Sequence, residues 1–250
     1  EVINAPRFAN VGMYDYVYLL DEETQFGAMT FTITPKLSFV AFEGTDQTMS
    51  GWKEDCLLAC RFPVESHTLG AEYLKKHISL TGPSVIVGGH SKGGNTALVS
   101  AMLVTGLKQR KISKVYSNDG PGLRKHEMES KAYKTVRSKL NHIVPHCSIV
   151  GMLLRHDKHY PIKSNTYGVF AHSMLTWEII DDKLRRSKLT AKSLALEKSL
   201  TEWLDGHSDE DRKKIIDGVF DLFEKSGIKE TVDIANAKKL VALDKNLKTV

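Results

Sequence analysis

The segment GGHSKGGN at residues 88–95 decides the fold. Residues 89–93 fit the pattern G-x-S-x-G, which places a serine on a sharp turn between a strand and a helix. The β-branched run SVIV at residues 84–87 precedes the segment, and a mostly apolar stretch follows it over residues 95–107. These flanks predict a strand, a tight turn at Ser91 and a helix, in that order.

The strand, turn and helix favour Ser91 as a nucleophile. The alternative is a glycine-rich turn that packs closely or holds a phosphate, but the segment fits neither G-x-x-x-x-G-K-[ST] nor G-x-G-x-x-G. Gly89 and Gly93 should leave space for the crossing of strand and helix around a strained residue. A serine hydroxyl needs a base, and a neutral imidazole held by a carboxylate removes its proton near pH 7.

The surrounding residues predict a mostly parallel central sheet flanked by helices. Strand patterns occur at residues 26–42, where a turn separates two strands, and at 114–117 and 141–144. A helical pattern occupies residues 66–77. The alternation of strands and helices is typical of an α/β fold. We expect the last strand of the sheet at residues 176–180.

The composition changes after residue 181. Apolar residues recur there at helical spacing among many charges, which predicts helices over residues 189–204, 210–225 and 231–247. We therefore expect an α/β core over residues 1–181. A helical C-terminal extension over residues 182–250 should pack on this core or bind a partner.

His172 is the expected base among ten histidines. Around such an elbow the partners follow in the chain order serine, acid, histidine, and His172 lies late, before the predicted last strand. His90 adjoins Ser91, and its side chain should diverge from the serine. Other loop or surface histidines stay open as alternatives: His146, His156 and His159.

Asp119 is the expected acid, because it follows a predicted strand at the carboxyl edge of the sheet, where catalytic groups gather. A turn aspartate that only caps the backbone is the alternative, since Gly-Pro-Gly follows it. Asp157 is the rival acid.

Acyl transfer also requires hydrogen-bond donors for the developing oxyanion, each worth about 3 kcal/mol. The backbone N–H of Lys92, the residue after the serine, is one expected donor. Thr45, in the FEGTD segment at residues 42–46, is the expected second donor through its N–H or its hydroxyl. An ordinary exit from a hairpin is the alternative interpretation of that segment.

Composition limits the possible classes of function. The 250 residues are 41% hydrophobic and 26% charged, which excludes wholesale disorder and a coiled-coil rod. The net charge of +5 comes without a nucleic-acid-binding motif, so we expect no nucleic-acid partner. No apolar run is long enough for a transmembrane helix, and no signal peptide is visible.

Three cysteines, at positions 56, 60 and 147, form no disulfide framework or metal motif and indicate a cytoplasmic compartment. We expect no metal ion and no organic cofactor. The sequence leaves an oligomer open.

Four segments, in this order, resemble the α/β hydrolases. The likeness is to class 3 lipases, and more closely to an uncharacterised bacterial family of lipase-like domains. It extends over roughly residues 4–180 and rests on GTD with GWKED (44–46, 51–55), GGHSKGGN (88–95), DGPG (119–122) and VPHCSIVGMLL (144–154).

This resemblance implies an α/β-hydrolase fold, with Ser91 as nucleophile and His172 as base. It also implies Thr45 and Lys92 as oxyanion donors, with Trp52 and Asp55 bracing their loop. The chain departs from the class 3 pattern at two positions. Those lipases usually carry their acid after a later strand, where this chain has Ser148, and they often have arginine where it has Glu43.

The sequence therefore predicts a serine hydrolase that cleaves a small-molecule or lipid carboxylic ester through an acyl-enzyme on Ser91. The alternative from another class is a catalytically silent hydrolase fold that serves as a binding or scaffold module. An amidase, peptidase or thioesterase would use the same residues.

Overall fold

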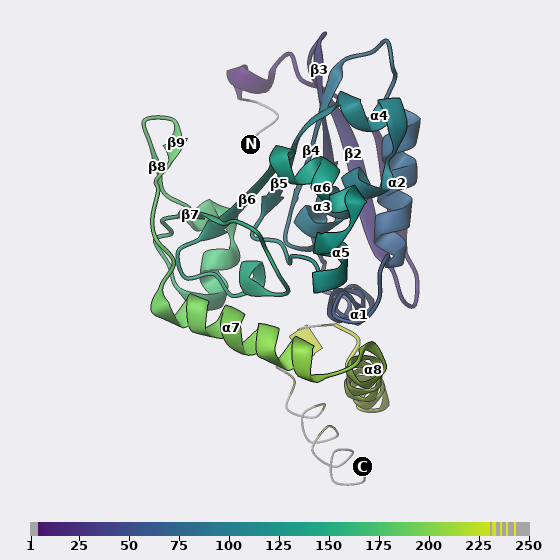
Figure 1. Cartoon of the computed structure of the whole chain (residues 1–250), viewed down its shortest axis with the longest axis vertical. Helices are drawn as coiled ribbons and strands as arrows, with labels where there is room; N and C mark the ends of the chain where they lie inside the picture. Colours follow the sequence, from purple (N-terminus) through teal and green to yellow (C-terminus); the bar gives the residue numbers. More distant parts are fainter. Residues whose placement is uncertain (1–4, 231, 234–235, 237–238, 240–242, 244–250) are drawn as a thin grey trace.

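A computed structural model describes residues 5–230, 232, 233, 236, 239 and 243 of the chain. Seven strands form one sheet in the spatial order of the sequence (Figure 1). They are β1 (Gly12–Leu20), β2 (Gln25–Thr34), β3 (Leu37–Phe42), β4 (Ser84–His90), β5 (Ile112–Asn118), β6 (Leu140–Pro145) and β7 (Tyr160–Ile162). β1, β2 and β3 pair antiparallel, and all neighbours from β3 to β7 pair parallel. The predicted mostly parallel sheet is confirmed.

The described residues form eight α-helices, of which the first six connect the parallel strands from β3 to β6 and the last two follow the strands. They are α1 (Met49–Leu57), α2 (Glu65–His77), α3 (Lys92–Leu103), α4 (Gly106–Lys111), α5 (Lys125–Glu129), α6 (Lys131–Val136), α7 (Ala191–Gly206) and α8 (Asp209–Lys225). α3 packs between α2 and α6 and against β4 and β5, and α2 also contacts β2. α7 and α8 lie below the sheet in Figure 1, next to α1. The described residues thus form an α/β fold, with a mostly parallel central sheet flanked by helices.

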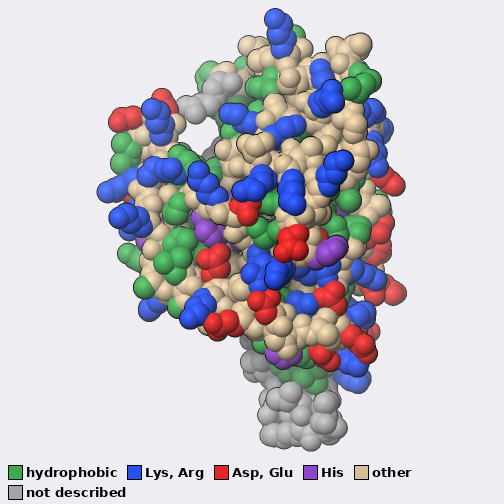
Figure 2. Space-filling view, in the orientation of Figure 1, with side chains coloured by type: hydrophobic (Ala, Val, Ile, Leu, Met, Phe, Trp, Pro, Cys, Tyr) green, Lys and Arg blue, Asp and Glu red, His purple; other side chains and the backbone are tan. Residues whose placement is uncertain are grey.

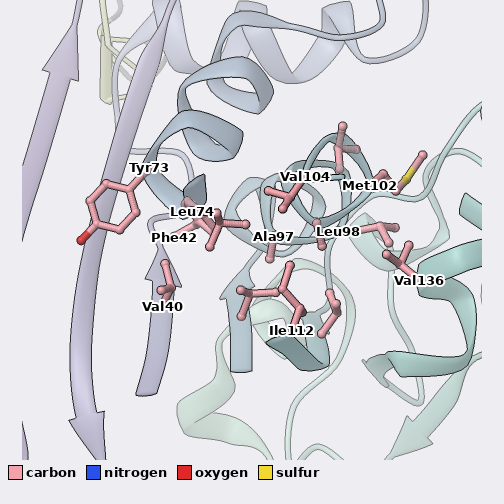
Figure 3. Close-up of a cluster of buried hydrophobic side chains, with 14 of the residues drawn as sticks. Val40, Phe42, Tyr73, Leu74, Ala97, Leu98, Met102, Val104, Ile112 and Val136 are labelled. Carbon is pink, nitrogen blue, oxygen red and sulfur yellow. The ribbon is translucent and has the colours of Figure 1, made fainter. Parts of the chain in front are cut away.

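The main core lies between the sheet and the helices α2, α3 and α6. Along β3 the side chains alternate between buried and half-buried positions, so that Val40 and Phe42 face the core. Figure 3 shows Phe42 beside Leu74 of α2, with Ala97 of α3 next to them. Burial of apolar surface is the dominant stabilising contribution in folding, and here it fixes α3 against the strand that precedes it.

At the crossing from β4 to α3 there is no space for side chains on Gly89 or Gly93. A Cβ atom on Gly89 would lie 2.6 Å from the carbonyl oxygen of Phe42. One on Gly93 would lie 2.6 Å from the carbonyl oxygen of Glu43. Because these neighbours are backbone atoms, they cannot move aside cheaply. The predicted packing role of both glycines is confirmed.

The prediction for the last strand of the sheet is wrong. Only Ile179–Ile180 (β8) of that segment forms a strand, and it pairs with Lys183–Leu184 (β9) in a separate two-stranded sheet. The last strand of the main sheet is β7, a three-residue edge strand in a polar stretch, where the sequence pattern is weak. β1 was also not predicted, because eight of its nine residues are exposed and give no buried periodicity.

The C-terminal extension contains α7 and α8 at the predicted positions. The third predicted helix, over residues 231–247, lies outside the described residues except at isolated positions. Leu204 and Ile216 of these helices pack with Leu57, Leu58 and Leu154 in a second apolar cluster. On the face in Figure 2 basic side chains predominate in the upper half, and acidic and basic side chains are interspersed in the lower half. Within the described ranges no helix combines the length and the apolar character needed to cross a bilayer.

Candidate active site

Ser91 lies at the junction of β4 and α3 in a strained backbone conformation. Its φ of 57° and ψ of −130° are unusual for a residue with a side chain. The N–H of Ser91 donates to the carbonyl oxygen of Asn118 at 3.0 Å. On the other side, a Cβ atom on Gly44 would lie 3.4 Å from the Cβ of Ser91. Backbone from neighbouring segments therefore holds this serine.

Asp119 and His172 are hydrogen-bonded to each other. The Nδ1 of His172 lies 2.7 Å from the Oδ2 of Asp119. Asp119 follows β5 at a positive φ of 50° and is fully buried, and its N–H donates to the carbonyl oxygen of Ile143 at 2.7 Å. His172 ends a 3₁₀ helix, Gly168–His172, and does not enter a strand of the main sheet. The pairing brings together two segments 53 residues apart.

The second carboxylate oxygen of Asp119 is also occupied. Its Oδ1 accepts from the hydroxyl of Ser148 at 2.5 Å and from the N–H of Gly151 at 3.2 Å. These donors orient the carboxylate so that Oδ2 faces His172. Sequence reasoning missed this role of Ser148, although its position in the stretch where class 3 lipases carry an acid was a usable signal.

His90 holds the backbone of His172. The Nε2 of His90 lies 2.7 Å from the carbonyl oxygen of His172, and because a carbonyl only accepts, this nitrogen carries the hydrogen. The two rings lie 4.2 Å apart. Burial lowers the pKa of His90, and the neighbouring His172 lowers it further. Nothing in the sequence pointed to this contact.

Ser91, His172 and Thr45 line one cavity of about 470 Å³. Its walls are largely apolar and come from α1, from the segment after β6, and from α7 and α8. Residues that contribute include Trp52, Leu58, Val150, Leu153, Trp203 and Ile216. The cavity therefore places the elbow serine and the histidine beside space suited to an apolar group.

The side chains of the two expected oxyanion donors are engaged elsewhere. The hydroxyl of Thr45 donates to Oδ2 of Asp55, and burial raises the pKa of Asp55 to about 7 although the charge of Lys92 opposes this shift. The Nζ of Lys92 is buried 3.0 Å from Oε2 of Glu54 and donates to the carbonyl oxygen of Gln25. The side chain of neither residue is therefore available as an oxyanion donor.

The rival residues lie elsewhere. Asp157 accepts from the hydroxyl of Tyr133 and pairs with Arg137, both at 3.0 Å. His146 accepts from the N–H of Ser164 at 3.4 Å. Neither these two residues nor the remaining alternatives, His156 and His159, are among the residues that line the cavity of Ser91.

Several solved structures resemble part of the chain. A fungal lipase–inhibitor complex is 19% identical, with 62% of this chain and 68% of that chain covered and a TM-score of 0.47. The native Rhizomucor miehei lipase propeptide complex is 18% identical, with 62% and 58% covered and a TM-score of 0.43. M37 lipase is 15% identical, with 78% and 69% covered and a TM-score of 0.43.

No curated protein matches the chain. A family-level match, in contrast, extends over residues 2–221 and so includes the elbow, both partners of the Asp119–His172 pair, helix α7 and most of helix α8. The chain belongs to the Mbeg1-like family.

Proposed function

We propose that this protein is a serine hydrolase that cleaves carboxylic esters, and that it is related to an uncharacterised bacterial family of lipase-like domains. The observation that carries the proposal is the hydrogen bond between His172 and the buried Asp119, on the wall of the cavity that Ser91 also lines. A carboxylate on Nδ1 fixes the hydrogen there, which leaves Nε2 of His172 as the base.

In the proposed reaction the hydroxyl of Ser91 attacks the carbonyl carbon of the ester while Nε2 of His172 accepts its proton. The carbonyl oxygen becomes an oxyanion, which the backbone N–H groups of Lys92 and Thr45 stabilise. The start of α3 at Lys92 adds the positive end of a helix dipole. Collapse of this intermediate breaks the bond to the alcohol, which leaves with the proton from His172. Water that His172 activates then releases the acid.

The cavity supports an ester with an apolar acyl group. Leu153, Trp203 and Ile216 offer contact area, and none of the three carries a charge. Burial of each CH₂ group contributes about 0.8 kcal/mol, so longer acyl chains gain affinity until the cavity is filled.

A fluorophosphonate probe, which reacts with activated serines, tests the proposal. We expect labelling of the wild-type protein, no labelling of Ser91→Ala, and full labelling of Ser187→Ala, a matched control outside the cavity. Folded wild-type protein that takes no label would overturn the proposal and favour the binding module.

A substrate panel then separates esters from other acyl compounds. p-Nitrophenyl esters from acetate to octanoate are compared with the matching anilides and thioesters at equal chain length. We expect the esters to be cleaved fastest and the rate to rise from acetate to the medium chains. Faster cleavage of anilides or thioesters would assign the same residues to an amidase or a thioesterase.

A further inference from the structure

Three histidine rings lie together beside the turn that follows Asp119. His142 belongs to β6, and His156 and His159 belong to the loop between β6 and β7. Each offers one ring nitrogen, and these three nitrogens all lie within 4.8 Å of one another. None of the three residues is among those that line the cavity of Ser91, and no step of the proposed hydrolysis uses them.

Hydrogen bonds fix the tautomer of two of these rings. Nε2 of His142 lies 3.0 Å from the carbonyl oxygen of Gly120. A carbonyl only accepts, so this nitrogen carries the hydrogen and Nδ1 of His142 presents a lone pair. Nε2 of His159 lies 2.9 Å from Oε1 of Glu197 on α7. An ionised carboxylate also only accepts, so Nδ1 of His159 presents a lone pair as well.

The two lone pairs face each other. Nδ1 of His142 lies 3.2 Å from Nδ1 of His159. Without a cation this contact is repulsive, because neither nitrogen has a hydrogen to offer the other. In a tetrahedral zinc site with Zn–N distances of 2.0–2.1 Å, neighbouring nitrogens are separated by about 3.4 Å. The observed separation is close to that spacing.

The outer contacts also match those of a metal site. Histidines that bind a metal usually donate their other N–H to a backbone carbonyl or a carboxylate, which orients the ring. Gly120 and Glu197 provide one partner of each kind. Imidazole nitrogens favour transition metals such as zinc, whereas calcium and magnesium prefer oxygen.

His156 is available as a third ligand. Its ring stacks on that of His142, with centroids 3.9 Å apart and planes 5° apart. Both of its ring nitrogens are buried, and neither makes a hydrogen bond of good geometry. An imidazole binds a metal in the plane of its ring, so His156 must rotate about its Cβ–Cγ bond to join the other two.

We propose that His142, His156 and His159 bind one divalent transition metal ion, zinc in first place, with water as the fourth ligand. Glu197 is the positioning residue that orients His159. The ion would join β6, the β6–β7 loop and, through Glu197, helix α7, and it would do so outside the cavity of Ser91. The proposed role of the ion is therefore to stabilise the fold, and it takes no part in the hydrolysis.

Cobalt(II) titration of the chelator-treated full chain tests the site, because tetrahedral cobalt absorbs visible light. We expect one ion per chain, displaced by Zn²⁺. His159→Gln should abolish the absorption, and Glu197→Gln should weaken binding roughly 10- to 100-fold. Both side chains are partly exposed, at 14% and 24%, so these variants should fold. His126→Gln, an exposed histidine outside the cluster, is the control and should bind normally.

A second readout follows stability. Zn²⁺ should raise the thermal midpoint of the wild-type protein and of His126→Gln, a chelator should reverse this, and His159→Gln should show no such rise. The proposal is overturned if folded wild-type protein binds neither metal, or if His159→Gln binds as tightly as the wild type. In that case a proton shared between the Nδ1 atoms of His142 and His159, and not a metal ion, would relieve the repulsion between them.

Discussion

The two sides of the candidate active site are held by different forces. On one side Ser91 is fixed by backbone packed against backbone, at Gly89 and Gly93, within the main core. On the other side His172 is positioned by hydrogen bonds from side chains, in a segment whose apolar residues Phe170 and Leu175 are 74% and 97% exposed. The position of the serine is therefore a property of the fold, whereas the position of the histidine can be changed while the fold survives.

The largest effect should come from Asp119→Asn, on the side of the site where side-chain hydrogen bonds position His172 (the side-chain half). The amide oxygen can still accept from Ser148 and Gly151, so the amide NH₂ is left facing Nδ1 of His172. That contact favours the wrong tautomer of His172. Ester turnover should fall by about 10⁴-fold, as measured with a p-nitrophenyl ester.

Thermal unfolding of Asp119→Asn should stay close to that of the wild type, because its buried contacts are kept. Near-normal turnover would show that another carboxylate serves His172. A collapse of the fold would contradict the contrast between the two sides.

Gly93→Ala tests the packing of backbone against backbone on the side of Ser91 (the backbone half of the site). The new Cβ would meet the carbonyl groups of Phe42 and Glu43, so the free energy of unfolding should fall by about 3 kcal/mol or more. Gly218→Ala in α8 is the control, since its Cβ meets nothing within 4 Å. It should stabilise the protein by up to about 1 kcal/mol. Urea unfolding measures both, and equal stability of the two variants would contradict the proposed packing.

Asp55, which accepts a hydrogen bond from the hydroxyl of Thr45, makes the free energy of unfolding depend on pH. Burial raises its pKa to about 7, so the folded protein holds a proton that the unfolded chain releases near pH 4. The resulting stabilisation is present below pH 4 and is lost as pH rises through 7. Between pH 5 and 8 it should fall by on the order of 2 kcal/mol.

Asp55→Asn should remove this loss. The measurement is urea unfolding of both proteins at pH 5 and pH 8. Buried histidines such as His67, whose pKa burial lowers to about 4, act in the opposite direction, but they affect both proteins equally. The same change in stability for wild type and variant would contradict the shifted pKa of Asp55.

Ser148→Ala should have the smallest effect. It removes one donor from the Asp119 carboxylate while Gly151 stays, so turnover should fall about tenfold. In the Asp119→Asn background the same substitution should lower turnover by a smaller factor, because the oriented carboxylate is already lost. Equal factors in both backgrounds would show that Ser148 acts independently of Asp119.

The sequence predicts the backbone half of the site well. The elbow follows from local signals: glycines, a β-branched run before them and an apolar helix after them. α2 follows from its helical periodicity and β2 from partial alternation, whereas β3 and β4 follow from short apolar and β-branched runs.

The side-chain half is less accessible to sequence analysis. The contact of Ser148 with Asp119 joins residues 29 apart, and that of His90 with His172 joins residues 82 apart. Such contacts depend on tertiary packing and leave no local pattern. β1 and β7 were missed for a related reason, since edge strands need not bury one face.

The apolar cluster of Leu57, Leu58 and Leu154 with Leu204 and Ile216 has a practical consequence. A chain cut at residue 181 would present these leucines to water and remove part of the cavity wall. The change of composition at that residue is therefore a poor place to divide the molecule. Exchange of α7 and α8 between relatives would instead transplant only the part of the cavity wall that these helices supply and leave the elbow intact.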